Sequence, residues 1–220
     1  MGVGNGPKLE GFDSLFGNVD AANIRSVSGS TITNTLTGNA TLSTGVSIVS
    51  SGGASYINFG GAGVVTSFSN TGISGANSRT LAAWVRFTSK ATQSVMSIGA
   101  NGAGTGFGLE TSSTVWNLSI GNSGTATTLT YDANVWYHVA YVGEFLTSNS
   151  ITSRLYINGE LRYSAATASI NTTNSPFYLG TNPSRLLRLN GFISQARVYK
   201  KALSTREISR NYEAFKGRYN

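Results

Sequence analysis

Short strand-forming runs fill the chain from residue 21 to residue 200. Each run is rich in valine, isoleucine, threonine and aromatic residues, and clusters of glycine, asparagine and serine separate it from the next. About a dozen such runs at short intervals are typical of an all-β antiparallel sandwich or barrel. The predicted strands cover residues 55–59, 64–68, 80–88, 94–98, 107–110, 114–120, 127–131, 135–143, 151–157, 160–164, 176–179 and 191–199.

The composition supports this class and excludes helical ones. The 220 residues include 27 glycines, and only 11% are charged, against about 25% in an average soluble domain. Glycine, asparagine, serine and threonine form turns and end strands more readily than they extend helices. Coiled coils and helical bundles are therefore excluded, and the length suits one domain.

One hairpin is marked by its turn. Asn158-Gly159 separates two short runs that alternate in polarity, residues 154–157 and 160–163. Asparagine and glycine accept the two positive φ angles that a type I′ turn requires. The two runs are therefore predicted to pair as antiparallel neighbours.

Two segments, residues 81–87 and 135–142, are apolar on both faces. Such strands are expected at the centre of a sheet, packed against the opposite sheet on one side and covered by loops on the other. The single histidine lies in the second segment, and packing is favoured over catalysis for it. Packing is also favoured over sugar stacking for the tryptophans. The residues concerned are His138, Trp84, Trp116 and Trp136.

The chain closes with a predicted helix over residues 205–216. Ser204 and Glu207 have the spacing of a capping box, in which each side chain bonds the other residue's backbone amide. Gly217 is expected to stop the helix. The apolar stripe of the helix comprises Ile208, Tyr212 and Phe215.

All of the net charge of +7 lies in the last fifth of the chain. Residues 1–178 hold seven basic and seven acidic side chains, whereas residues 179–220 hold nine basic and two acidic ones. Two interpretations are open: a solvated basic face on the terminal helix, which is favoured, or a surface for an acidic partner. Nucleic-acid binding is disfavoured because aromatic residues interleave with basic ones only around residues 197–201.

Several kinds of chemistry are excluded or disfavoured. The absence of cysteine rules out disulfides, thiolate zinc sites and a cysteine nucleophile, and one histidine rules out sites that need two. The paired carboxylates of a jelly-roll glucanase, spaced E-x-D-x-x-E, do not occur, so hydrolysis is disfavoured. No apolar run approaches the length of a membrane span, and the N-terminus does not resemble a signal peptide.

Two weaker patterns favour loops over ligand sites. Asn101-Gly-Ala-Gly-Thr-Gly106 resembles a phosphate loop but lacks the lysine and the following helix. Asp132 and Asn134 carry oxygens that suit calcium, although an ordinary turn is favoured. No resident cofactor or metal is therefore predicted, with Ca²⁺ the one weak alternative.

A set of motifs in a fixed order resembles the laminin-G-like domains of the concanavalin A-like lectin/glucanase superfamily. The resemblance covers about residues 18–219 and implies a two-sheet antiparallel jelly-roll sandwich with a short C-terminal helix. It leaves residues 1–17 as an N-terminal arm before a domain over residues 18–220. The motifs include Tyr56-Ile-Asn-Phe-Gly60, Thr80-Leu-Ala-Ala-Trp-Val85, Trp136-Tyr-His-Val-Ala140, Leu155-Tyr-Ile-Asn-Gly159, Phe177-Tyr-Leu-Gly180 and Asn190-Gly-Phe-Ile-Ser-Gln-Ala-Arg-Val-Tyr199.

The two ends of this region have a narrower resemblance. Asp20-Ala-Ala-Asn23 and residues 211–219 resemble single-domain laminin-G-like proteins encoded by tailed bacteriophages of cyanobacteria and marine bacteria. That resemblance implies a non-enzymatic virion surface protein, such as a capsid decoration or tail appendage, assembled in the host cytoplasm and located in the virion. It also implies other virion proteins as partners and a homo-oligomer such as a trimer. Many members bind glycans, and some bind calcium.

Attachment to such a particle is expected to use the N-terminal arm, the basic C-terminal region, or both. Two alternatives remain open. One is a carbohydrate-binding tail fibre or adhesin with its site in loops at one edge of the sandwich. The other is a polysaccharide hydrolase built from carboxylates far apart in sequence. The candidate docking residues are Phe12, Leu15, Phe16, Arg185, Arg188, Lys200 and Lys201.

Overall fold

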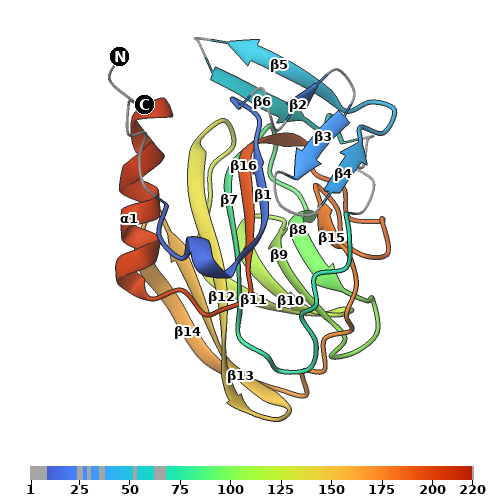
Figure 1. Cartoon of the computed structure of the whole chain (residues 1–220), viewed down its shortest axis with the longest axis vertical. Helices are drawn as coiled ribbons and strands as arrows, with labels where there is room; N and C mark the ends of the chain where they lie inside the picture. The colour runs from blue at the N-terminus through green and yellow to red at the C-terminus, as the bar shows by residue number, and fades with distance from the viewer. Residues whose placement is uncertain are drawn as a thin grey trace.

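The structure, a computed structural model, describes residues 9–23, 27–28, 31–34, 38–51, 54–61 and 68–219. Figure 1 shows three layers, in which α1 (Thr205–Phe215) covers one face of a large sheet and a smaller sheet packs on the other face. Both sheets are antiparallel. The predicted all-β jelly-roll sandwich with one C-terminal helix is confirmed.

The large sheet contains eight strands. From one edge their order is β14, β13, β12, β7, β16, β6 and β5, and β1 also pairs with β16. The strands are β1 (Leu15–Asp20), β5 (Ser47–Ser51), β6 (Ala54–Asn58), β7 (Arg79–Phe87), β12 (Trp136–Thr147), β13 (Ser150–Ile157), β14 (Glu160–Ala168) and β16 (Gly191–Tyr199).

The small sheet contains five strands in the order β11, β10, β9, β8, β15. They are β8 (Gln93–Gly99), β9 (Gly106–Ser112), β10 (Val115–Ile120), β11 (Ser123–Thr130) and β15 (Phe177–Leu179). A third, three-stranded sheet lies to one side and contains β2 (Val27–Ser28), β3 (Thr31–Asn34) and β4 (Gly38–Thr41).

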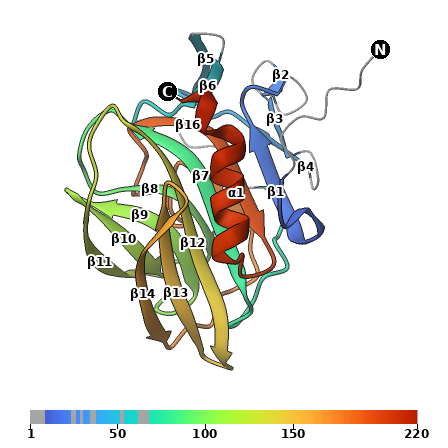
Figure 2. The same ribbon diagram turned by 90° about the vertical axis from the view of Figure 1, so that its left-hand side faces the viewer.

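The central strands β7 and β12 explain why two segments are apolar on both faces. In β7, Leu81 and Val85 join the core between the two sheets, whereas Ala82 joins a second cluster beneath α1. The central position was predicted correctly. The covering layer was not, because α1 rather than loops lies over this face, as Figure 2 shows.

The predicted hairpin between β13 and β14 is confirmed. Asn158 and Gly159 have φ angles of 51° and 83°, as a type I′ turn requires. Ile157 pairs with Glu160, and a register shift follows between Leu155 and Tyr156. The shift fits a β-bulge, which increases the local twist of the edge strand.

The predicted helix cap is also confirmed. The Ser204 side chain accepts a hydrogen bond from the Glu207 amide, and the Glu207 carboxylate accepts one from the Ser204 amide. The α-helix ends beside Gly217 as expected, with Lys216 as its C-cap, but not through a left-handed glycine. The chain instead continues into a 3₁₀ turn, η2 (Lys216–Arg218), in which Gly217 does not adopt a positive φ.

Five strands near the N-terminus were not predicted, namely β1 to β5. They are short or rich in glycine, serine and threonine, so they lack the apolar alternation that marks the later strands. The predicted strand over residues 64–68 lies, apart from Phe68, outside the described residues. Within the described part of the chain, no helix is long and apolar enough to cross a membrane.

Candidate functional site

The outer face of the small sheet is polar because its strands alternate. On β9 and β10, the side chains of Leu109 and Leu118 point into the sandwich core. Their neighbours along each strand therefore point outward, away from the large sheet. The outward set is almost entirely polar and comprises Ser94, Ser97, Glu110, Asn117 and Ser119, together with Gly108 and Gly124.

Strand register arranges these outward residues in two rows. In the first row, Glu110 lies directly between Ser94 on β8 and Asn117 on β10. In the second row, Gly108 lies between Ser97 and Ser119. Residues directly opposite each other in an antiparallel pair share a face and contact one another, so each row is a continuous strip across the sheet.

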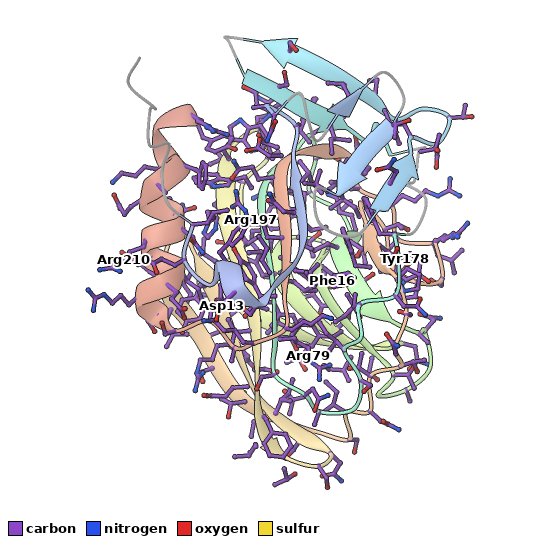
Figure 3. All side chains as sticks on the ribbon, viewed as in Figure 1. Asp13, Phe16, Arg79, Tyr178, Arg197 and Arg210 are labelled. Atoms are coloured by element: carbon purple, nitrogen blue, oxygen red, sulfur yellow. The ribbon has the colours of Figure 1, made fainter. Side chains whose placement is uncertain are left out.

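The second row ends at an aromatic ring. Tyr178 on β15 pairs with Ser97 and is half-buried. Figure 3 shows Tyr178 on the side of the molecule opposite α1. Aromatic faces are suited to stacking against sugar rings, so this end of the strip offers a second kind of contact beside the polar groups.

A groove of about 320 Å³ lies over the part of these strips on β9, β10 and β11, and Ser94, Ser97 and Tyr178 do not line it. Its floor includes Glu110, Asn117 and Ser119, and one wall is the loop over residues 182–187. This size is within the range of small-ligand sites, about 300–1,000 Å³. Leu186 on the wall is 80% exposed, which places an apolar side chain at the mouth of a polar site.

Asn182 holds that wall in place. Its Oδ1 atom accepts hydrogen bonds from the Ser184 hydroxyl at 3.0 Å and from the amides of Leu186 and Leu187 at 3.1 and 3.2 Å. One side-chain oxygen thus replaces the partners that this short turn lacks. The Ser97 hydroxyl also donates to the carbonyl of Thr181, which fixes the base of the loop on the sheet.

Glu110 is the charged group of the groove. Its side chain is only 5% exposed. Burial raises its pKa to about 6, and hydrogen bonds from Ser119 and Asn117 limit the rise. The neighbouring Ser94 hydroxyl is buried and has no hydrogen-bond partner among the described residues.

The glycines of the floor let polar side chains lie flat. A Cβ atom at Gly108 would overlap the Ser119 hydroxyl, and one at Gly124 would overlap the Asn117 amide. Both side chains therefore rest on space that only glycine leaves open. The sequence signal of this floor is a polar residue or glycine at alternate positions of two strands whose other positions are mostly apolar.

The glycine-rich segment 101–106 is a packing element at the end of this groove. It forms the turn between β8 and β9, as expected for a loop. A Cβ atom at Gly121, in the turn between β10 and β11, would overlap the carbonyl of Gly102. The two turns thus pack backbone against backbone, which explains the glycines without a phosphate.

The seven predicted docking residues fall in two separate parts of the fold. Arg185 and Arg188 lie on or beside the wall loop. Leu15, Phe16 and both lysines lie where β1 and β16 pair and end, on another side of the sandwich. The structure therefore places the first pair at the wall loop, outside the lining of the groove, and keeps the others away from it.

Most of the candidates around β1 and the end of β16 make contacts within the chain. Phe16 is buried in the core, and the Lys200 ammonium lies 4.7 Å from the centre of its ring. Lys201 pairs with Glu207 at 2.7 Å. Leu15 packs beside the cluster under α1. Phe12, in contrast, is 61% exposed.

Four of the nine basic side chains of the C-terminal region form ion pairs within the described chain, namely Lys201, Arg210, Lys216 and Arg218. Figure 3 shows Arg210 extending from α1 and Arg197 between α1 and the sheet. Arg210 bonds the Glu10 carboxylate at 2.9 Å, and Arg218 bonds Asp20 at 3.1 Å. Arg197 donates to Asn18 and lies over an aromatic ring, that of Phe215. These contacts fix the terminal helix on the sheet.

The remaining sequence candidates are structural in their surroundings. His138 is buried beside Trp84, at 5.3 Å between ring centres, and burial lowers its pKa to about 3. Trp116 is buried in the core. Asp132 pairs with Lys90 at 3.1 Å. No group of three potential metal-ligating side chains occurs among the described residues.

A match to a family model shows which superfamily the chain belongs to. Residues 51–209 match the model of the concanavalin A-like lectin/glucanases superfamily. The chain belongs to this superfamily. No curated protein sequence matches this lectin/glucanase-like chain.

Solved structures with the same fold are distant in sequence. Domain 4 of AbnA, an extracellular arabinanase from Geobacillus stearothermophilus solved with arabinotriose, is 16% identical at a TM-score of 0.67; the match covers 89% of this chain and 97% of that one. The Trypanosoma rangeli sialidase solved with sialic acid is 16% identical at a TM-score of 0.68, and the match covers 93% of this chain but only 33% of the sialidase. The binding domain of Paraclostridial Mosquitocidal Protein 1 is 19% identical at a TM-score of 0.63, with 92% and 52% covered. These likenesses show the shared fold.

Proposed function

We propose that this chain is a non-enzymatic carbohydrate-binding domain whose site is the groove on the outer face of the small sheet. The observation that carries the proposal is the pair of polar strips under a pocket of about 320 Å³. Carboxylate, amide and hydroxyl groups that converge in one pocket match the alternating donors and acceptors of a sugar. The arabinotriose complex of a similar fold supports the same class of ligand.

Binding without hydrolysis is proposed on the number of carboxylates. Glycosidases generally place two carboxyl groups about 5–10 Å apart across the scissile bond. Among the described residues that line the groove, Glu110 is the only carboxylate. A groove with one acid can orient a sugar but lacks the second group that the reaction requires.

An oligosaccharide array tests this proposal. The full chain is applied to immobilised arabino-, xylo-, cello- and N-acetylchito-oligosaccharides, and the best binder is titrated by calorimetry. Replacing Asn117 by alanine is expected to weaken binding about tenfold, because one buried hydrogen-bonding group in the floor is lost. The Asn171→Ala variant is the matched control, since Asn171 is exposed and does not line the groove.

Each outcome of that experiment is decisive. Binding that falls in Asn117→Ala and persists in Asn171→Ala supports the groove. Silence on the whole array, or equal affinities for both variants, would overturn it. Release of new reducing ends from the bound oligosaccharide would instead favour the hydrolase.

We further propose that the domain serves on the surface of a virion, as a capsid decoration or tail appendage. The support is the resemblance of residues 20–23 and 211–219 to phage-encoded proteins of this kind. Phe12 adds a structural observation, because its ring is 61% exposed beside the paired Asp13 and Lys201. An exposed aromatic side chain of this kind suits a contact with another protein or another copy of the chain.

Labelling of purified particles tests the virion role. An antibody to the chain is expected to decorate the particles in electron micrographs, and quantitative gel staining then gives the copy number. Many copies on the head indicate decoration, and a few copies at the tail indicate an adhesin. Particles that carry no label and no copy of the chain would contradict the proposal.

A further inference from the structure

We propose that the groove selects its glycan by charge and prefers sugars that carry a free amine. This inference rests on the proposed carbohydrate-binding function and specifies the ligand of the same site. The ammonium group of the sugar would lie against the Glu110 carboxylate, while the neighbouring amide and hydroxyl groups bind the sugar hydroxyls. Acidic sugars would be rejected.

The first observation is that Glu110 differs from every other acid in the molecule. Of the nine acidic residues of the chain, the other eight each lie within 3.8 Å of a lysine or arginine nitrogen. In the described part of the chain, Glu110 forms no such ion pair. It is also the least exposed of the nine, whereas most of the paired acids lie near the surface.

A buried carboxylate without a cation is costly. Burial disfavours the charged form, and the neutral donors Asn117 and Ser119 offset only part of this penalty. Proteins commonly meet the cost with a basic side chain nearby. Among the described residues that line this groove, no basic side chain occupies that position. A ligand that brings an ammonium group therefore gains a charge-assisted hydrogen bond with Glu110.

The side chains that line the groove around Glu110 are neutral, although Arg185 lies on the wall loop outside the lining. Strand β8 contributes Ser94, strand β10 contributes Asn117 and Ser119, and the wall loop contributes Asn182. No lysine, arginine or histidine is among the described residues that line the groove. An acidic sugar would therefore place a second negative charge beside Glu110 with no lining cation to balance it, and like charges at short distance repel strongly.

The net charge of the protein argues against a nonspecific preference for amines. The chain carries +7, so long-range electrostatics repel a cationic oligosaccharide and attract an anionic one. A preference for the amine must therefore come from a local group. Tighter binding of the amine-bearing sugar would therefore indicate a local carboxylate rather than the net charge.

Three hexasaccharides of matched length test the inference by calorimetry near neutral pH: β-1,4-linked glucosamine, β-1,4-linked N-acetylglucosamine and galacturonic acid. The glucosamine oligomer is expected to bind the unaltered chain at least about tenfold more tightly than the acetylated one, a typical effect of a charged hydrogen bond. The galacturonate oligomer is expected not to bind. In Glu110→Gln the first two oligomers are expected to bind alike.

The control variant is Glu213→Gln, which makes the same chemical change on α1, outside the groove. It is expected to keep the full preference. A second measurement uses the unaltered chain alone: at about pH 5, below the pKa of Glu110, the affinity for the glucosamine oligomer is expected to fall about tenfold while the affinity for the acetylated oligomer stays constant. This measurement holds even if Glu110→Gln does not fold.

The outcomes separate the two proposals. Charge selection would be overturned, and carbohydrate binding left intact, by any of three results. These are equal affinity for the glucosamine and N-acetylglucosamine oligomers near neutral pH, a preference that survives in Glu110→Gln, or binding of the galacturonate oligomer. No binding of any hexasaccharide, together with a silent array, would overturn carbohydrate binding itself.

Discussion

Acidification from pH 6.5 to pH 3 is expected to destabilise the folded chain by up to about 5 kcal/mol through His138 alone. Burial lowers the pKa of His138 from 6.5 to about 3 in the folded state. A difference of that size between folded and unfolded chains corresponds to about 1.4 kcal/mol per pH unit across the window. Between these two values the unfolded chain binds a proton that the folded chain does not, so stability falls as the pH falls.

The surroundings of His138 explain why it resists protonation. Its ring lies beside Trp84 and Tyr212, at 5.3 and 6.0 Å between ring centres, and these two rings stack on each other. The nearby Arg197 also disfavours a second positive charge. The Nδ1 atom has no partner among the described residues, so no hydrogen bond at that atom repays the cost of charging the ring.

Urea denaturation at a series of pH values measures this effect. His138→Phe keeps an aromatic ring in the same packing and cannot bind a proton, so its stability is expected to change much less between pH 6.5 and pH 3. Equal acid sensitivity of the variant and the unaltered chain would show that another group governs the transition.

Glu110 acts in the opposite sense and serves as an internal comparison. Its pKa is raised in the folded state, from 4.5 to about 6. Between about pH 6 and pH 4.5 the folded chain therefore binds a proton that the unfolded chain does not. Acidification across this range stabilises the fold by about 2 kcal/mol through Glu110. Glu110→Gln is expected to remove that gain and to steepen the loss of stability on acidification.

Replacing Trp116 by alanine is expected to lower the free energy of unfolding by about 3–5 kcal/mol. The Trp116 side chain is fully buried and contacts the rings of Phe87, Tyr131 and Tyr137, with centres 5.5 to 5.8 Å away. Its removal costs the transfer energy of a large aromatic group and leaves a cavity that these rigid neighbours do not fill.

Trp136→Ala is the matched control for that prediction. Trp136 lies on the outer face of the large sheet and is only half-buried, against Tyr56 and Tyr219. It is therefore expected to cost less than half as much. Denaturant midpoints and slopes for both variants check this, and a loss for Trp116→Ala no greater than that for Trp136→Ala would contradict the placement of the core.

The parts of the fold that follow from neighbouring residues could be predicted. The Asn158-Gly159 turn and the Ser204–Glu207 cap are each determined by a few adjacent side chains, and both occur as expected. The later strands were found because apolar and β-branched residues recur along them. Strand β1 was missed because Leu15 and Phe16 are followed at once by glycine and asparagine, which hide its alternation.

The candidate groove depends on pairing between distant segments, and the sequence does not state that pairing. Ser94, Glu110 and Asn117 form a row only because of the registers of β8, β9 and β10. Glu110 also matches no paired-carboxylate motif, because it is a single acid with no second acid at the required spacing. Its distinguishing property is the lack of a cation in space, which a linear pattern does not reveal.

Both ends of the described chain are held on the α1 side of the sandwich, and this determines how the domain would be displayed. The Glu10 amide bonds the Asn211 side chain, and Tyr219 stacks on Trp84 at 4.0 Å, so both ends lie on the α1 side. The groove lies on the outer face of the small sheet, on the opposite side of the sandwich. Anything joined to either end would hold the groove outward, and many copies on one support would form an array. Weak single contacts would then add up to high avidity.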